Sequence, residues 1–307
     1  MKNIIFVIFL SVSFNFAQTS GNFYSPNSAA DRKEMSPNVK ADSTATVADE
    51  LNNRAVKLGL KNLYAEAVEL LRKAIEIDPN SVIIRRNLGI ALFNLKDFDE
   101  AIKLLKQVRE KEVAVDAKTQ GFLGEALFAV GEYEESLSAF QKALEIEPDN
   151  AIALYNYGSV LQELKHYQQA LKNYDKAVAL QPDLAKAFNN RGMTYFLLGN
   201  YQKAVADLQK AFALDASIVE VHNNLGVVFS QLGKKKAAHK YFLEAIRLRP
   251  DYDRAHYNLA LNYHERSKPE EAFRHFLRLK SLNADLSEQL RKEMSKQFIV
   301  NASENKN

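Results

Sequence analysis

The feature that most constrains this chain is an internal repeat of 34 residues. Four glycines mark the period: Gly124, Gly158, Gly192 and Gly226. If Asp116 is treated as a single inserted residue, seven consecutive repeats fit the same frame, at 48–81, 82–115, 117–150, 151–184, 185–218, 219–252 and 253–286. Such a period is typical of arrays in which each repeat buries its apolar face against its neighbours.

Each repeat has the pattern of two amphipathic helices. In the fourth repeat the apolar residues recur at helical spacing, at Leu154, Tyr157 and Leu161 and again from Leu171 onward. Breakers such as Gly131-Glu132 separate the two helices, and a second helix ends before Pro148. The chain has only 11 Gly and 7 Pro in 307 residues, which argues against a turn-rich β fold. An all-α chain is therefore predicted.

The residues within the repeats resemble the tetratricopeptide repeat (TPR) family. The sixth repeat carries the family's pattern of large and small residues at His222, Leu225, Gly226, Phe229, Ala238, Phe242, Ala245 and Pro250. The resemblance implies a right-handed α-α superhelix, or solenoid, of seven helix-turn-helix units. An apolar stripe after Asp285 predicts a C-terminal capping helix at 287–300, followed by a disordered tail at 301–307. The insertion of Asp116 is expected to change how the second and third repeats stack.

The N-terminus has the outline of a secretory signal peptide at 1–17. Lys2 precedes an apolar stretch from Ile4 to Phe16, and the small residue Ala17 follows it as the expected cleavage site. The stretch is short for a membrane span, which needs about 20 residues. Residues 18–47 are rich in Ser, Ala, Asn, Thr and Pro and predict a disordered linker. We expect an exported protein, periplasmic or secreted, with an uncleaved N-terminal membrane anchor as the alternative.

Charge and motif content argue against several classes of function. The 41 basic and 38 acidic side chains are mixed along the chain, so no field of one sign exists to attract nucleic acid. The absence of cysteine rules out disulfides, thiol catalysis and Cys-ligated metals. The six histidines are scattered, and His222 and His256 are interpreted as fillers between helices. We predict no enzyme, no cofactor and no metal site.

The candidate binding residues lie at positions 5 and 6 of the repeats. Position 6 is asparagine in six of seven repeats, at Asn53, Asn87, Asn156, Asn190, Asn224 and Asn258, with Phe122 as the exception. Position 5 adds Tyr155, Asn189, Asn223 and Tyr257. An amide both donates and accepts, so a file of asparagines could bind the backbone of an extended peptide. It looks like the asparagine ladder in the repeat domain of O-GlcNAc transferases.

Two structural alternatives stay open for these residues. Each asparagine could instead satisfy a neighbour along the array, without any ligand. The aromatic residues at position 12, Phe93, Phe128 and Phe196, could be peptide anchors or core.

The leading hypothesis is an exported, non-catalytic scaffold or adaptor that binds polypeptide partners in its concave groove. The alternatives are a self-assembling structural protein, as a homo-oligomer, and an accessory subunit of a cell-envelope or glycan enzyme. Position 5 lacks the lysine with which some TPR domains grip a C-terminal carboxylate, which argues against that partner class.

Overall fold

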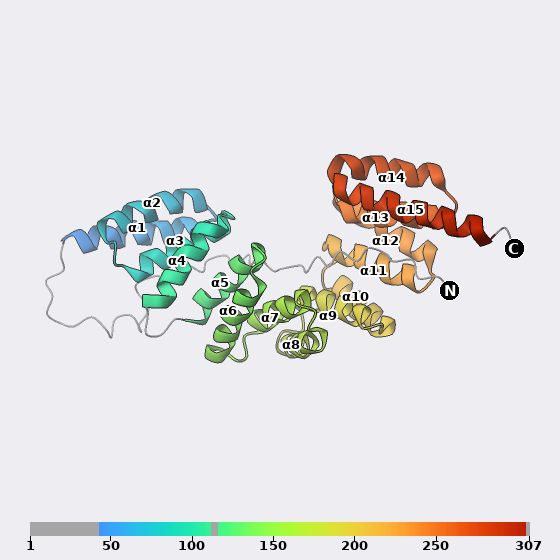
Figure 1. Cartoon of the computed structure of the whole chain (residues 1–307). Coiled ribbons are helices and arrows are strands. Elements are labelled where there is room, and N and C mark those ends of the chain that lie inside the picture. The colour runs from blue at the N-terminus through green and yellow to red at the C-terminus, as the bar shows by residue number, and fades with distance from the viewer. Residues whose placement is uncertain (1–42, 112–115, 305–307) are drawn as a thin grey trace. The chain divides into compact units, whose positions relative to one another are not determined.

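The described part of the chain is helical throughout. The computed structural model describes residues 43–111 and 116–304, with side chains for 47–109 and 116–295. Every secondary-structure element in these ranges is an α-helix, and the fold class is confirmed as all-α (Figure 1). The expected signal peptide, linker residues 18–42 and tail residues 305–307 lie outside the described residues. None of the helices described is both long and apolar enough to cross a bilayer.

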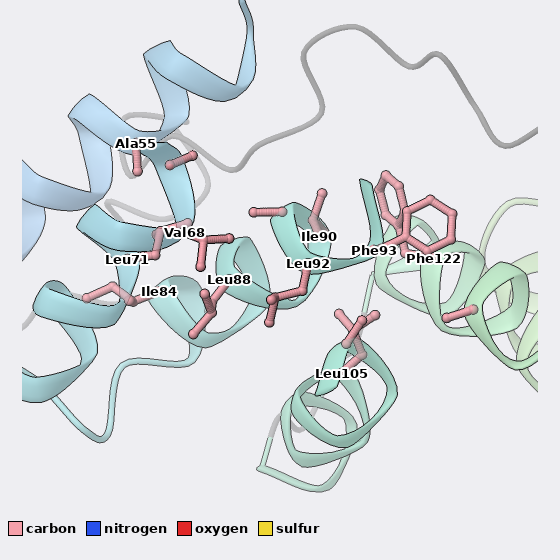
Figure 2. Close-up of a cluster of buried hydrophobic side chains, with 14 of the residues drawn as sticks. Ala55, Val68, Leu71, Ile84, Leu88, Ile90, Leu92, Phe93, Leu105 and Phe122 are labelled. Carbon is pink, nitrogen blue, oxygen red and sulfur yellow. The ribbon is translucent and has the colours of Figure 1, made fainter. Parts of the chain in front are cut away.

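The helices form two compact bodies. The N-terminal body contains α1 (Ser43–Gly59), α2 (Tyr64–Ile77), α3 (Val82–Asn94), α4 (Phe98–Lys111), α5 (Ala117–Ala129), α6 (Tyr133–Ile146) and α7 (Ala151–Glu163). In this body the two helices of a repeat pack together, and the second helix then packs on the first helix of the next repeat. Leu71, Ile84, Leu88 and Leu105 meet in its core, as Figure 2 shows.

The C-terminal body repeats this arrangement. It contains α8 (Tyr167–Leu180), α9 (Ala185–Leu197), α10 (Tyr201–Leu214), α11 (Val219–Gln231), α12 (Lys235–Leu248), α13 (Asp253–Glu265), α14 (Pro269–Leu282) and α15 (Ala284–Glu304). Its core gathers Leu208, Leu225, Phe242 and Leu259. The last helix, α15, packs against α13 and α14 and buries Leu290 on that core.

Both outer helices are longer than the sequence suggested. α1 begins at Ser43, whereas the repeats were expected to begin at residue 48, and α15 runs from Ala284 to Glu304 around the expected cap at 287–300. A fading apolar pattern marks where packing on the core weakens, and residues with ordinary helix propensity can extend the helix past that point.

The inserted residue Asp116 has a local structural role. It is the N-cap of α5, where its Oδ1 accepts from the Thr119 backbone N–H at 2.8 Å and its Oδ2 accepts from the Thr119 hydroxyl at 2.8 Å. Arg86 Nη2 of α3 lies 3.4 Å from the same carboxylate. A capped helix begins at its cap, so the extra residue marks the start of α5.

The turns within the repeats share one left-handed residue. Gly131, Gly199 and Gly233 have φ angles of 86°, 77° and 73°. The same place in the other repeats is taken by Asn62, Lys96, Lys165 and Ser267, with φ between 57° and 65°. Glycine relieves the steric cost of this conformation, so the glycine turns are the less strained ones.

Candidate functional site

The asparagines of the first helices form a ladder of side-chain hydrogen bonds. In three junctions the position-6 amide donates to the position-5 amide of the preceding repeat: Asn87 to Asn52 at 2.8 Å, Asn224 to Asn189 at 2.9 Å, and Asn258 to Asn223 at 2.9 Å. The first helices of these repeats contact one another directly, as α1 with α3, α9 with α11 and α11 with α13. The ladder therefore joins successive repeats through their first helices.

The ladder amides are enclosed by protein. The position-6 members Asn87, Asn156, Asn190, Asn224 and Asn258 are 0–5% exposed. A buried amide without a partner would cost roughly 1–3 kcal/mol, so bonds along the array are needed for the fold itself. These contacts are the ones expected if each asparagine satisfies a neighbour along the array. The role in peptide binding stays a prediction.

Two junctions in the N-terminal body depart from the regular pattern. Phe122 replaces the asparagine of the third repeat and packs edge-on against Phe93, with the ring centroids 5.3 Å apart (Figure 2). Position 5 of the same repeat is Gly121, which has no amide to offer. Asn156 of the fourth repeat therefore donates to Glu125 Oε1, at 3.0 Å. Glu125 and Asn52 are ladder members that the sequence analysis did not select.

The remaining predicted residues lie beside the ladder. Asn190 accepts from Asn189 Nδ2 at 3.0 Å. Asn53 is half-buried on α1, and no described repeat precedes it to supply a position-5 acceptor. Tyr155 and Tyr257 are fully buried. Burial, and secondarily the charge of Glu293, raise the pKa of Tyr257 above its ordinary value, so this phenol stays neutral.

The position-12 phenylalanines divide between core and partly open settings. Phe93 and Phe196 are buried in the cores of their bodies. Phe128 is half-buried against Tyr133, with the ring centroids 5.3 Å apart. Among these three rings, Phe128 is therefore the one with surface left for a partner.

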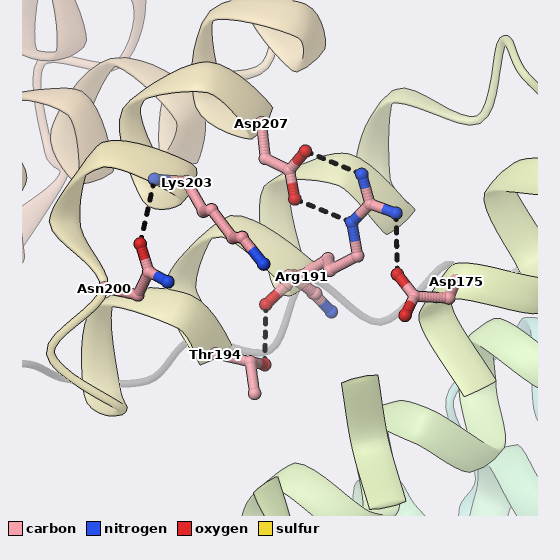
Figure 3. A network of polar contacts seen from close by, with 7 residues as sticks. Asp175, Arg191, Thr194, Asn200, Lys203 and Asp207 are labelled. Carbon is pink, nitrogen blue, oxygen red and sulfur yellow. Dashed lines mark hydrogen bonds and ion pairs between the residues drawn. The ribbon is translucent and has the colours of Figure 1, made fainter. Parts of the chain in front are cut away.

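An ion triad in the C-terminal body was missed by the sequence analysis. Arg191 occupies position 7 of its repeat, where the family pattern has leucine. Its guanidinium binds Asp207 through two bonds of 2.7 Å and Asp175 through one of 2.8 Å (Figure 3). Burial alone lowers the pKa of Arg191, but the bonds and charges of Asp207 and then Asp175 outweigh it and raise the pKa. The sequence did contain a signal for this triad, because Arg191 is a charged residue at a position where the family pattern has an apolar one.

The histidines at position 4 fill space and bind backbone. His222 Nε2 lies 2.8 Å from the Ala216 carbonyl oxygen, and His256 Nε2 lies 3.0 Å from that of Pro250. His256 Nδ1 also lies 2.9 Å from His275 Nδ1. Burial, and then the charges of His256 and His239, lower the pKa of His275 to about 4. No group of three or more potential metal ligands is assembled by residues 43–111 and 116–304.

Together, stacked helix pairs, left-handed turns and first helices joined side by side define an all-α repeat scaffold. Family models described as tetratricopeptide repeat match at residues 61–119, at 115–183, 149–217 and 183–251, and at 223–286. Matches to this one family thus run without a gap from residue 61 to residue 286. The chain belongs to the tetratricopeptide repeat family.

Curated relatives match part of the chain. The small glutamine-rich tetratricopeptide repeat-containing protein 2 of Mycosarcoma maydis is 32% identical over 112 residues, covering 36% of this chain and 32% of the relative. The protein of the same name from Saccharomyces cerevisiae is 31% identical over 130 residues, covering 41% and 36%. The chain thus spans about a third of the length of these relatives.

Solved structures share the fold. A tetratricopeptide repeat protein from Parabacteroides merdae is 16% identical with a TM-score of 0.68, covering 81% of this chain and 99% of that one. The APC/C hetero-tetramer Cut9–Hcn1 contains a chain with 16% identity and a TM-score of 0.64, covering 83% and 57%. At this identity the likeness concerns the fold, which is that of a scaffold compatible with binding proteins.

Proposed function

We propose that this protein is an exported, non-catalytic scaffold that binds polypeptide partners along the first helices of its repeats. Proteins built from these repeats are generally non-catalytic scaffolds, and the first helices of a stacked array form its usual binding surface. The observation that carries the proposal is the amide ladder, because it places the same polar group on the first helix of every repeat except the third.

The ladder bonds leave hydrogen-bonding capacity unused. An asparagine amide has two N–H donors and an oxygen with two lone pairs, so one bond along the array does not saturate it. Asn258 Oδ1 and Asn156 Oδ1 accept no hydrogen bond from the described residues. A free acceptor of this kind on a first helix suits the N–H groups of an extended peptide backbone. Structural and binding roles are thus compatible in one ladder.

Export rests on the N-terminal pattern, with Lys2 before an apolar stretch and Ala17 after it. The test is N-terminal sequencing of the protein recovered from envelope and external fractions of its own cell. A mature chain beginning at Gln18 is expected. Recovery of an intact N-terminus in the membrane fraction would instead indicate an uncleaved anchor.

Binding is tested by affinity capture from the envelope fraction with the full chain. The variant carries Asn156→Ala, Asn190→Ala and Asn224→Ala, and the matched control is Asn173→Ala. The amide of Asn173 is exposed on the second helix α8 and bonds only to the Gln169 carbonyl of its own helix. Circular dichroism checks that each protein is folded. A partner retained by the control and lost by the folded triple variant supports the proposal, and no specific capture by the parent contradicts it.

Self-assembly is a second candidate, favoured by an apolar surface on α14. Phe273 and Leu277 are 56% and 50% exposed there, and Phe273 stacks on Phe276. Large exposed apolar side chains side by side often mark an interaction surface. Sedimentation velocity over a range of concentrations separates the candidates, because a strict monomer at high concentration eliminates self-assembly.

A further inference from the structure

The C-terminal body contains a hollow of about 620 Å³, lined by residues of α10, α11 and α12. Four rings belong to its lining: Phe212 of α10, His222 and Phe229 of α11, and Tyr241 of α12. Phe229 and Tyr241 stack with their centroids 5.5 Å apart, and Phe212 meets the ring of His222 edge-on at 5.3 Å. Rings from three helices around one hollow suit a further aromatic group, and we name this site the Phe212 pocket.

The rings of the Phe212 pocket keep surface that a partner can reach. Phe212 is 37% exposed, and Phe229 and Tyr241 are half-buried. His222 is enclosed, and its Nε2 lies 2.8 Å from the Ala216 carbonyl oxygen, which holds this ring in place. The pocket therefore combines one fixed ring with three rings that still offer contact area.

The repeat pattern does not require these rings. The position of Phe212 holds a half-buried aliphatic residue in four other repeats, at Ile75, Leu144, Val178 and Ile246. Tyr241 stands where the two preceding repeats have Asn173 and Asp207. Packing of the array is thus achieved elsewhere without an aromatic residue at either position. The stacked pair and the partly exposed Phe212 are features of this junction.

Cations border the rings of the Phe212 pocket. Lys240 and Arg247 line it and are exposed, and Lys236 lies one helical turn before Lys240 on α12. The acidic residue of the lining is Glu244, which accepts bonds of 2.6 and 2.8 Å from Arg247. Two cations against one carboxylate leave the lining with a positive charge, to which Lys236 adds.

The cationic head groups remain able to bind an anion. Glu244 uses two of the five N–H donors of Arg247, at Nε and Nη2. Lys240 is exposed and has three donors of its own. A carboxylate placed beside the rings would accept charge-assisted hydrogen bonds from these groups. The lining therefore fits a ligand that carries an aromatic ring and a nearby negative charge.

We propose that the Phe212 pocket binds an aromatic side chain of a partner polypeptide, in a segment where acidic residues flank that side chain. This inference rests on the proposed scaffold function and names the chemistry of one partner segment. The ring lies against Phe212 and the stacked pair of Phe229 and Tyr241, as an anchor does in a protein interface. The flanking carboxylates accept from Lys240 and Arg247. None of the ladder amides lines this pocket, so it is a second contact site on the scaffold.

The direct test adds the acetylated, amidated pentapeptide Ser-Asp-Phe-Asp-Ser to the ¹⁵N-labelled full chain. Ser-Asp-Ala-Asp-Ser removes the ring, and Ser-Lys-Phe-Lys-Ser reverses the charge. Saturable shifts of the Ala237 and Lys240 backbone amide signals are expected with the first peptide alone. Equal shifts with either control peptide, or no shift of these signals with the first, would overturn the proposal.

Variants of the protein make the test specific. Phe212→Ala removes an exposed ring of the lining, and Lys240→Gln with Arg247→Gln removes its positive charge. Each should weaken binding of the acidic aromatic peptide at least tenfold. The matched control for the first is Leu243→Ala, because Leu243 is 42% exposed on α12 and does not line the pocket.

The matched control for the charge variant is Arg291→Gln with Lys292→Gln, two exposed cations of α15. Both control proteins should bind the peptide with parental affinity, and circular dichroism checks that every variant is folded. Parental affinity in folded Phe212→Ala, or in the folded Lys240→Gln and Arg247→Gln protein, would refute the assignment.

The outcomes also separate this inference from the proposed function. If the partner captured from the envelope is retained by both pocket variants and lost only by the triple asparagine variant, the pocket assignment fails while the scaffold function stands. If the acidic aromatic peptide binds as expected but the parent captures no partner, the scaffold function is the part that fails.

Discussion

Two glycine-to-alanine substitutions on α5, three residues apart, should change stability in opposite directions. At Gly124 an added Cβ would lie 2.8–2.9 Å from three ring carbons of Phe140, which is fully buried. Carbon atoms prefer about 3.5–4.0 Å, so the ring or the helix must move by roughly 0.6–1.2 Å. The Gly124 carbonyl also accepts a 2.6 Å bond from the buried Ser136 hydroxyl, which resists that movement.

The magnitudes follow from two competing effects. Overpacking a core costs about 1–3 kcal/mol, whereas replacing glycine by alanine inside a helix returns about 1 kcal/mol. Gly124→Ala should therefore lose up to about 2 kcal/mol of stability. Gly121→Ala meets no atom within 4 Å and should gain about 0.5–1 kcal/mol from the helix effect alone.

The assay is urea unfolding of the full chain, with hydrogen exchange of the α5 amides as a local measure. Repeat arrays can unfold in parts, so the local measure is needed beside the global midpoint. A midpoint that rises for both variants would show that the contact between Gly124 and Phe140 is looser than the distances indicate. A fall for both would show that the space at Gly121 is not available to a side chain.

Four further perturbations have defined outcomes. Asn258→Ala leaves Asn223 Oδ1 without its donor and should cost about 1–3 kcal/mol in thermal or urea unfolding, whereas the exposed Asn173→Ala should change stability by less than about 0.5 kcal/mol. Arg191→Met leaves the enclosed carboxylate of Asp207 without its partner and should lower the free energy of unfolding by about 3–5 kcal/mol. A smaller loss in the double variant that also carries Asp207→Asn would show that the two residues are energetically coupled. Because the pKa of His275 falls from 6.5 to about 4 on folding, the unfolded chain binds the proton first as pH drops, so stability should be complete above pH 6.5 and decline towards about pH 4. Partial exposure of this ring limits the effect to roughly 1–2 kcal/mol, and His275→Gln should flatten that part of the unfolding profile. Finally, Phe273→Glu with Leu277→Glu should abolish any concentration-dependent sedimentation, and association that persists would place the contact elsewhere.

The pairing of helices could be predicted from the sequence, because it follows from the 34-residue repeat and from the helix-breaking residues between the helices. The spacing of Gly158 and Gly192 and the turn at Gly131 determine where helices cross and end, whatever the details of packing. The start of α1 was less well predicted, because Ser43 lies outside the repeated pattern. The start of α15 was also less well predicted, because the seventh repeat has Ala284 at the position where the sixth has Pro250. The N-cap role of Asp116 was not predicted, because the repeat pattern identifies this residue only as an insertion and does not show its hydrogen bond to Thr119.

The choice between the two interpretations of the asparagines could not be made from sequence. Each regular ladder bond joins residues 35 positions apart, as with Asn224 and Asn189, so it exists only once two first helices lie side by side. Whether an amide faces a neighbouring repeat or the outside depends on its rotamer, and period and composition do not encode rotamers. The same holds for Arg191, whose partners Asp175 and Asp207 come from two other helices.

The ladder and its interruption differ in chemical character. Where the amide pairs are regular, as at Asn223 and Asn258, each pair contains its own donor and acceptor. The bond forms only while the two repeats keep their register, so these pairs serve the packing of the array. In the third repeat the paired amide is replaced by Gly121, Phe122 and Glu125, which together leave space, an apolar wall and a carboxylate. A repeat serving stability alone would be improved by an asparagine at position 121. A urea midpoint that falls in the folded Gly121→Asn protein would contradict this reasoning and show that the space beside Phe122 and Glu125 does not accept an amide.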